Sequence, residues 1–97
     1  MTPEQFTNSL LDAAPPEQAS APLQALWYDA KGEWKRAHSL VDALETSDGM
    51  AVHAYLHRKE GAESNAEYWY RVAGTAHRRP TLEAEWSALV QFLLGES

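Results

Sequence analysis

The sequence predicts an all-α fold, one domain of about six short helices. Apolar residues recur every three or four positions along most of the chain, and no stretch alternates apolar and polar residues with the period of a strand. Hydroxyl residues, Gly and Pro mark helix starts and stops that divide the chain into six segments. The 97 residues, 44% of them hydrophobic, suffice for one core. We therefore predict a single helical domain over residues 1–97.

The first three helices are predicted from their ends. Residues 2–5, Thr-Pro-Glu-Gln, are typical of a capping box. Phe6, Leu10 and Leu11 form the apolar stripe of this helix, which with its Pro-rich linker covers residues 1–19. A second helix is expected from about residue 20 to Gly32, and a third from about residue 33 to Leu44.

The last three helices follow a turn at residues 46–49. The fourth is expected from near Asp48 to Gly61 and is apolar on two sides, which is typical of a helix in the middle of an assembly. The fifth covers about residues 63–72. The C-terminal segment, residues 80–97, holds a helix capped by Thr81, with an apolar face made of Leu82, Trp86, Leu89, Val90 and Leu93.

The middle of the chain contains an internal repeat over residues 21–74. Gly32 and Gly61 lie 29 residues apart, and so do Ala25 and Ala54, and Ala37 and Ala66. In each copy a helix reaches Gly, turns, and re-enters a helix that carries Ala at its crossing point. Small residues let two antiparallel helices approach closely, and Gly adopts the positive φ of a helix end. The repeat therefore predicts two helical hairpins.

These hairpins resemble the tetratricopeptide repeat family. The residues that carry the resemblance are Ala25, Tyr28, Gly32, Trp34, Ala37 and Leu44 in the first copy, and Ala54, Gly61, Ala66, Tyr70 and Ala73 in the second. The family repeats about every 34 residues, so the second helix of each pair or its exit turn is expected to be shorter here. Parts of residues 52–71 are also similar to short uncharacterised bacterial proteins, which implies no activity.

The resemblance implies a scaffold that binds a protein or peptide partner. In such arrays the first helix of each pair lines a concave face. The outward positions are then Leu26, Asp29, Tyr55, Arg58 and Lys59. An aromatic ring beside two cations suits an acidic or C-terminal peptide. The alternatives are that Arg58 and Lys59 are solvated, Tyr55 packs on a neighbouring helix, or the terminal helices cover this face.

Charge is segregated along the chain, whose formal net charge is −6. All eight Lys and Arg residues lie between residues 31 and 79, whereas residues 1–30 and 80–97 carry acids and no Lys or Arg. The acidic ends either keep the chain in solution or pack beside, or compete for, a basic face in the middle.

Two histidines give an alternative function. His53, His57 and Glu60 stand at i, i+4 and i+7 on one helical face, where two imidazoles and a carboxylate can bind a transition metal. The competing interpretation is that both histidines are hydrogen-bonded core residues. We expect no cofactor.

Other function classes are disfavoured. The chain has no Cys, no nucleophile elbow and no Gly-rich phosphate loop, so we expect no enzyme. The net charge disfavours nucleic acid, although the basic residues 77–79 are compatible with a phosphate contact as well as with a solvated connector. No run of apolar residues suits a membrane span and no signal peptide is evident, so a cytoplasmic, bacterial protein is expected.

The prediction is a non-catalytic protein–protein interaction module. Tyr68 and Trp69 lie on different sides of the fifth helix, and whichever is exposed would be the anchor of a homodimer. Tyr55 or Tyr68 would provide affinity for an acidic partner. The small metal-binding protein remains the alternative.

Overall fold

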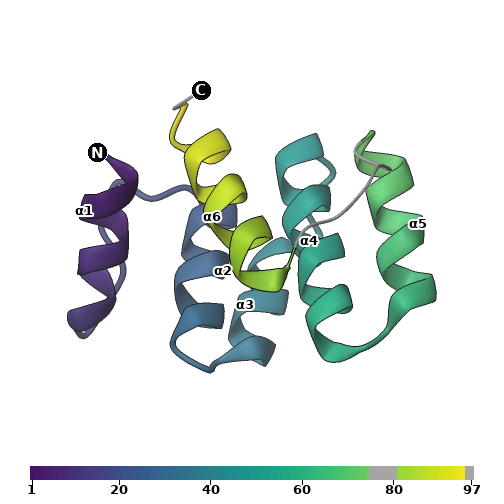
Figure 1. Ribbon diagram of the computed structural model, residues 1–97, viewed down its shortest axis with the longest axis horizontal. Helices are drawn as coiled ribbons and strands as arrows, with labels where there is room; N and C mark the ends of the chain where they lie inside the picture. The colour runs from purple at the N-terminus through teal and green to yellow at the C-terminus, as the bar shows by residue number, and fades with distance from the viewer. Residues whose placement is uncertain (75–80, 96–97) are drawn as a thin grey trace.

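The computed structural model describes residues 1–74 and 81–95, and within these ranges it contains helices and no strand. This confirms the all-α prediction. The elements in chain order are α1 (Pro3–Asn8), the short 3-10 helix η1 (Ser9–Leu11), α2 (Ala21–Ala30), α3 (Trp34–Val41), α4 (Ser47–Glu60), α5 (Glu63–Ala73) and α6 (Leu82–Leu93) (Figure 1). The basic loop at residues 77–79 lies outside the described residues.

The predicted helix starts are confirmed by their caps. The hydroxyl of Thr2 accepts a hydrogen bond from the Gln5 N–H at 3.1 Å, and the Gln5 side chain accepts one from the Thr2 N–H, which completes the capping box. Ser20 and Thr81 cap α2 and α6 with their hydroxyls. The expected turn at residues 46–49 is instead the start of α4, where Thr46 is the cap and Ser47 the first helical residue. Helix α3 is shorter than expected, because it ends at Val41 and Leu44 lies in the following turn.

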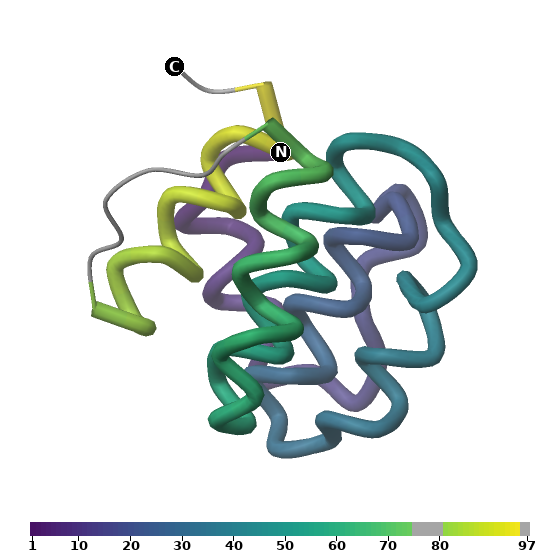
Figure 2. The backbone as a smooth tube through the Cα atoms, turned by 90° about the vertical axis from the view of Figure 1, so that its right-hand side faces the viewer, coloured from purple at the N-terminus to yellow at the C-terminus, as the bar shows by residue number. Residues whose placement is uncertain are grey.

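The two predicted hairpins are α2 with α3 and α4 with α5 (Figures 1 and 2). Gly32 and Gly61 end the first helix of each pair with φ of 84° and 91°, values that residues with a Cβ rarely adopt. All four alanines of the repeat, at positions 25, 37, 54 and 66, are buried. Their small size allows the close helix packing that the repeat predicted.

One apolar core joins α1, α2, α3, α4 and α6, and its largest fully buried side chains are Trp27, Phe6, Leu26, Leu56, Val41, Val52 and Val90. The indole of Trp27 donates to the Ser9 hydroxyl at 3.1 Å and so attaches the N-terminal segment to α2. Leu11 was expected on the apolar stripe but is 90% exposed, because the 3-10 turn replaces the helix there.

Helix α6 packs on α1, α2 and α4, so the C-terminal helix returns to the N-terminal half of the chain (Figure 1). The surface of α2 and α4 that α6 covers is called the inner face below. Helix α5 packs on α4 and leaves Tyr68 and Val72 exposed. None of the helices in residues 1–74 and 81–95 is long and apolar enough to cross a membrane.

Candidate functional sites on the two faces of helix α4

Helix α4 contacts α2, α3, α5 and α6, and it buries seven of its residues. Its helical period places Tyr55 and Lys59 on the inner face, one turn apart. His53 and His57, also one turn apart, lie on the side that meets α3 and α5. Both sides therefore bring polar groups into the packed interior.

On the inner face a buried carboxylate links α2 to α4. Asp29 is 2% exposed, and its two oxygens receive the Lys59 ammonium at 3.0 and 3.1 Å and the Tyr55 hydroxyl at 3.2 Å. Burial raises the pKa of Tyr55 well above its ordinary value, and the neighbouring Asp29 charge adds to this shift. Tyr55 is therefore a neutral donor at physiological pH.

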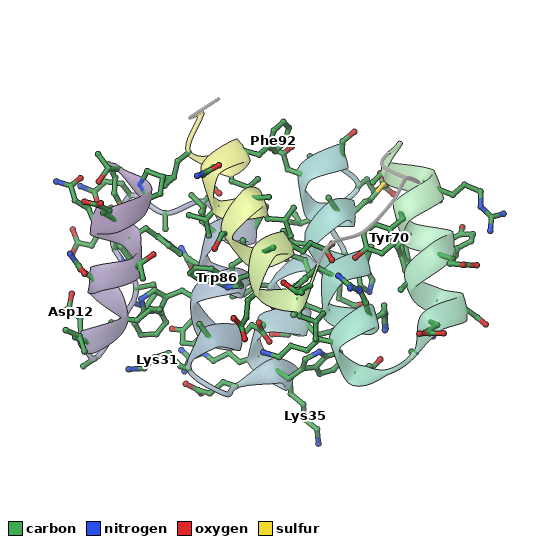
Figure 3. The ribbon with its side chains drawn as sticks, viewed as in Figure 1. Asp12, Lys31, Lys35, Tyr70, Trp86 and Phe92 are labelled. Carbon is green, nitrogen blue, oxygen red and sulfur yellow. The ribbon has the colours of Figure 1, made fainter. Side chains whose placement is uncertain are left out.

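A second carboxylate holds α6 against this face. Arg58 donates to Glu85 Oε1 at 2.6 Å, and the Tyr70 hydroxyl donates to Glu85 Oε2. We call Arg58, Tyr70 and Glu85 the carboxylate clamp. In the next position of α6, the Trp86 indole donates to the Leu26 carbonyl at 3.0 Å (Figure 3). Two adjacent residues of α6, Glu85 and Trp86, therefore form hydrogen bonds with three helices, α2, α4 and α5.

Three of the six predicted partner-binding residues are buried in this structure. Leu26, Asp29 and Tyr55 are each at most 2% exposed, and Arg58 and Lys59 are paired with carboxylates. The expectation that Leu26, Asp29 and Tyr55 line an open concave face is wrong, because these side chains are packed beneath α6. Lys59 stays exposed over 39% of its side chain, and Arg58 over 24%. Tyr68, the sixth predicted residue, is 56% exposed on α5.

The segregation of charge in the sequence indicated, as one of two alternatives, that acidic end segments pair with basic residues in the middle of the chain. Glu85 comes from the acidic C-terminal segment and Asp29 from the acidic N-terminal segment, and each pairs with a cation of the basic middle. The structure thus supports the alternative in which the acidic ends pack beside a basic face. Beside α6 a cleft of about 420 Å³ remains, lined by Leu10, Asp29, Ala30, Tyr55, Lys59, Leu82, Glu83, Trp86 and Ser87.

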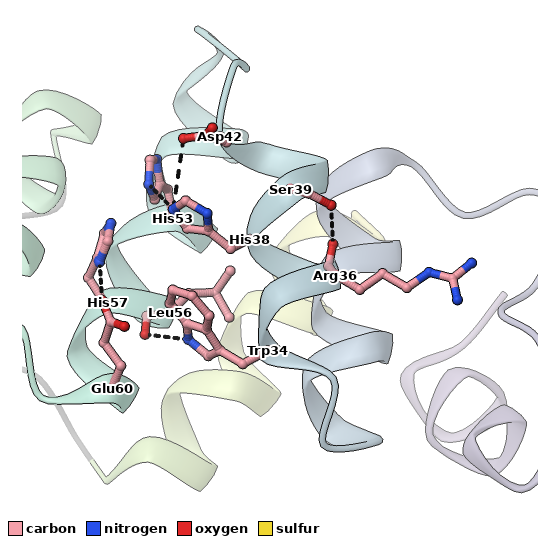
Figure 4. Close-up of polar contacts among 9 residues, drawn as sticks. All are labelled: Trp34, Arg36, His38, Ser39, Asp42, His53, Leu56, His57 and Glu60. Atoms are coloured by element: carbon pink, nitrogen blue, oxygen red, sulfur yellow. Dashed lines mark hydrogen bonds and ion pairs between the residues drawn. The ribbon is translucent and has the colours of Figure 1, made fainter.

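On the opposite side of α4 lies a histidine cluster, made of His38, His53 and His57. His38 reaches across from α3, and its Nε2 lies 3.0 Å from Nε2 of His53 (Figure 4). The ring centroids of His53 and His57 are 4.7 Å apart, and those of His38 and His57 are 5.3 Å apart. One nitrogen from each ring lies within 4.8 Å of the other two.

Aromatic rings enclose this cluster. Trp34 stacks on His38 with a centroid distance of 4.9 Å and an interplanar angle of 11°. Trp69 stacks on His53 with a centroid distance of 4.3 Å and an interplanar angle of 24°. The Trp34 indole is itself fixed by a 2.9 Å hydrogen bond to the Leu56 carbonyl. The indoles therefore restrict the orientation of two of the three imidazoles.

Burial keeps His53 neutral. The residue is 3% exposed, and its Nδ1 is buried without a hydrogen-bond partner among the described residues. Burial lowers the pKa of His53 to about 4, with further lowering by His57 and His38 and an opposing effect of Asp42. At neutral pH this imidazole therefore carries a lone pair and no charge.

Glu60 has a different position from the one the sequence predicted. Its carboxylate binds Nδ1 of His57 at 2.7 Å, so it orients that imidazole, and the third nitrogen of the cluster comes from His38. The helical period relates only residues of one helix, and for that reason His38 was missed. Its place next to Ala37, the crossing residue of α3, is the signal that could have found it.

Comparisons of the sequence with protein-family models and curated proteins, and of the structure with solved structures, found no match.

Proposed function

We propose that this chain is a non-catalytic, cytoplasmic interaction module whose inner face binds an acidic amphipathic helix of a protein partner. In the structure α6 occupies this face. The resemblance of the two hairpins to tetratricopeptide repeats supports the same class of function, since such scaffolds bind peptides on the face formed by the first helices of successive pairs.

The observation that carries the proposal is the carboxylate clamp with its neighbouring indole. Arg58 and Tyr70 provide two donors for one carboxylate, and the Leu26 carbonyl accepts from an indole one residue further along the same helix. A helix laid in a groove is recognised by such periodic anchors. The partner is therefore expected to present a Glu followed by a Trp on an otherwise apolar helix face.

The tether between α6 and the rest of the chain determines how a partner competes. A segment joined to its binding site by a short linker acts at an effective concentration of about 1 mM or more. An added helix at micromolar concentration therefore binds only if it fits better than α6 or if α6 is weakened. The tethered α6 thus makes the inner face selective for partner helices that fit it better than α6 does.

The experiment adds a fluorescein-labelled peptide of residues 81–95 to the full chain and measures fluorescence anisotropy. Glu85→Gln in the full chain removes the charge that Arg58 and Tyr70 bind, so α6 is released more easily while the peptide keeps its own glutamate. We expect the apparent affinity for the peptide to rise at least tenfold over the unsubstituted chain.

Glu83→Gln is the matched control, because it removes the same charge from an exposed position of the same helix. This variant should bind the peptide no better than the unsubstituted chain. Equal binding by the two variants, or no binding by the Glu85→Gln chain with its helical circular dichroism intact, would overturn the proposal.

A further inference from the structure

We propose that His38, His53 and His57 bind one divalent transition-metal ion of the zinc class, at a site separate from the inner face. The three imidazoles come from two helices, α3 and α4, so the ion would join the second helix of one hairpin to the first helix of the next.

The spacing of the nitrogens is close to that of a metal site. Zinc binds imidazole nitrogen at about 2.0–2.1 Å, which places two tetrahedral ligands roughly 3.3 Å apart. The His38 and His53 nitrogens lie 3.0 Å apart, and the three ligand atoms are all within 4.8 Å. The His57 nitrogen lies up to 4.8 Å from the others, so this imidazole would have to move toward them by up to about 1.5 Å.

The hydrogen bonds around the cluster leave ligand atoms available. Glu60 accepts from Nδ1 of His57, which fixes the tautomer whose Nε2 carries the lone pair. Carboxylate–histidine pairs of this kind orient the ligands of many metal sites. The His53 nitrogen that faces His38 is Nε2, and an ion bound between the two rings would replace the 3.0 Å contact of their Nε2 atoms. Nδ1 of His53 is buried without a partner among the described residues. A buried polar atom without a partner is uncommon in a folded protein.

The donor set selects the class of metal. Three neutral imidazoles suit Zn²⁺, Ni²⁺, Co²⁺ and Cu²⁺, whereas Mg²⁺ and Ca²⁺ prefer oxygen ligands. Asp42 Oδ1 lies 3.8 Å from His38 Nε2, which makes this carboxylate a candidate for a fourth position.

Two tryptophans report on the site. Trp34 and Trp69 stack directly on His38 and His53, so an ion bound to these imidazoles changes the fluorescence of both indoles. The experiment titrates the chelator-treated full chain with Zn²⁺ at pH 7.5 and measures both heat and tryptophan fluorescence. Mg²⁺ is titrated in parallel.

We expect one Zn²⁺ per chain, no response to Mg²⁺, and a melting temperature about 10 °C or more higher at a free zinc concentration 100 times the Kd. Glu60→Gln keeps all three imidazoles and should weaken zinc binding by about 10-fold or more. His38→Gln and His57→Gln each remove a ligand and should weaken it further. The fourth histidine of the chain, His77, lies outside the described residues, and His77→Gln is the control for histidine number.

The wild-type titration tests the proposal even if a histidine variant does not fold. Absence of a stoichiometric zinc site in the wild-type chain would mean that the cluster is only an aromatic and imidazole core, and would overturn the proposal. A zinc affinity of His38→Gln and His57→Gln equal to that of the wild-type chain, or loss of binding in His77→Gln alone, would also overturn it.

Discussion

The two faces of α4 accommodate buried polar side chains in different ways. On the inner face both buried carboxylates have two partners each, since Asp29 binds Lys59 and Tyr55, and Glu85 binds Arg58 and Tyr70. On the opposite face, which carries the histidine cluster, Nδ1 of His53 is buried and has no partner within residues 1–74 and 81–95.

The two faces therefore differ in how much stability is lost when one polar side chain is replaced. The charges of the inner face are compensated within the fold, so removal of one partner leaves the other charge buried and destabilises the protein. In the histidine cluster His53 is neutral and one of its nitrogens has no partner among the described residues, so replacement of this side chain is expected to cost little stability. The following four predictions test this contrast, from the largest expected effect to the smallest.

Breaking the carboxylate clamp should have the largest effect. Arg58→Glu places two carboxylates together at a site where Glu85 is only 10% exposed, and we expect a loss of about 3–5 kcal/mol of unfolding free energy in urea titrations. The charge-exchanged double variant, Arg58→Glu with Glu85→Arg, should recover at least about 1 kcal/mol of that loss. No recovery would show that the two charges are not energetically coupled.

Lowering the pH should weaken the histidine face. His53 has a pKa of about 4 in the folded chain against 6.5 as its ordinary value, so the unfolded chain binds a proton more readily. Stability is therefore complete above about pH 6.5 and falls by about 3 kcal/mol as the pH approaches 4. Urea unfolding with chelator at several pH values measures this decrease, and His53→Asn should show a smaller one. An equal decrease in both chains would contradict the assignment.

Tyr55→Phe removes one donor to Asp29 without changing the shape of the inner face. Because a hydrogen bond to a buried charge is lost while Lys59 remains, we expect a decrease of about 1.5–3 kcal/mol in unfolding free energy. Thermal and urea unfolding at pH 7 measure it. Tyr68→Phe is the control, because that residue is exposed, and its stability should match that of the unsubstituted chain.

His53→Leu should have the smallest effect on stability. Leucine fills a similar volume against Trp69 and removes an unpartnered buried nitrogen, so unfolding free energy in chelator should change by no more than about 1 kcal/mol. The same variant should bind zinc far more weakly. A loss as large as that of Tyr55→Phe would mean that the two faces do not differ.

Local chemistry made most of the fold predictable. Caps such as Thr2 and Thr81 and the left-handed glycines Gly32 and Gly61 act within a few residues, so the sequence locates them directly. Helix α3 was predicted too long because apolar spacing continues to Leu44, although the chain turns after Val41.

The sites were harder to predict, because both depend on contacts between helices. The sequence grouped Asp29, Tyr55 and Lys59 correctly on one surface, and these side chains do meet. It left open what covers that surface, since the docking of α6 depends on the packing of distant segments. His38 belongs to a different helix from His53, so no spacing rule within one helix relates them.

The contact between α6 and α2 also has a consequence for folding during synthesis. The Trp86 indole and the Leu26 carbonyl are 60 residues apart, whereas the Trp34 indole and the Leu56 carbonyl are 22 residues apart. Closing the longer loop costs about 0.9 kcal/mol more in chain entropy. At a ribosome both hairpins are made before residues 81–95, which follow roughly 1–4 s later. During that interval α6 is not yet present to cover the inner face, so the proposed acidic partner helix would not have to displace it.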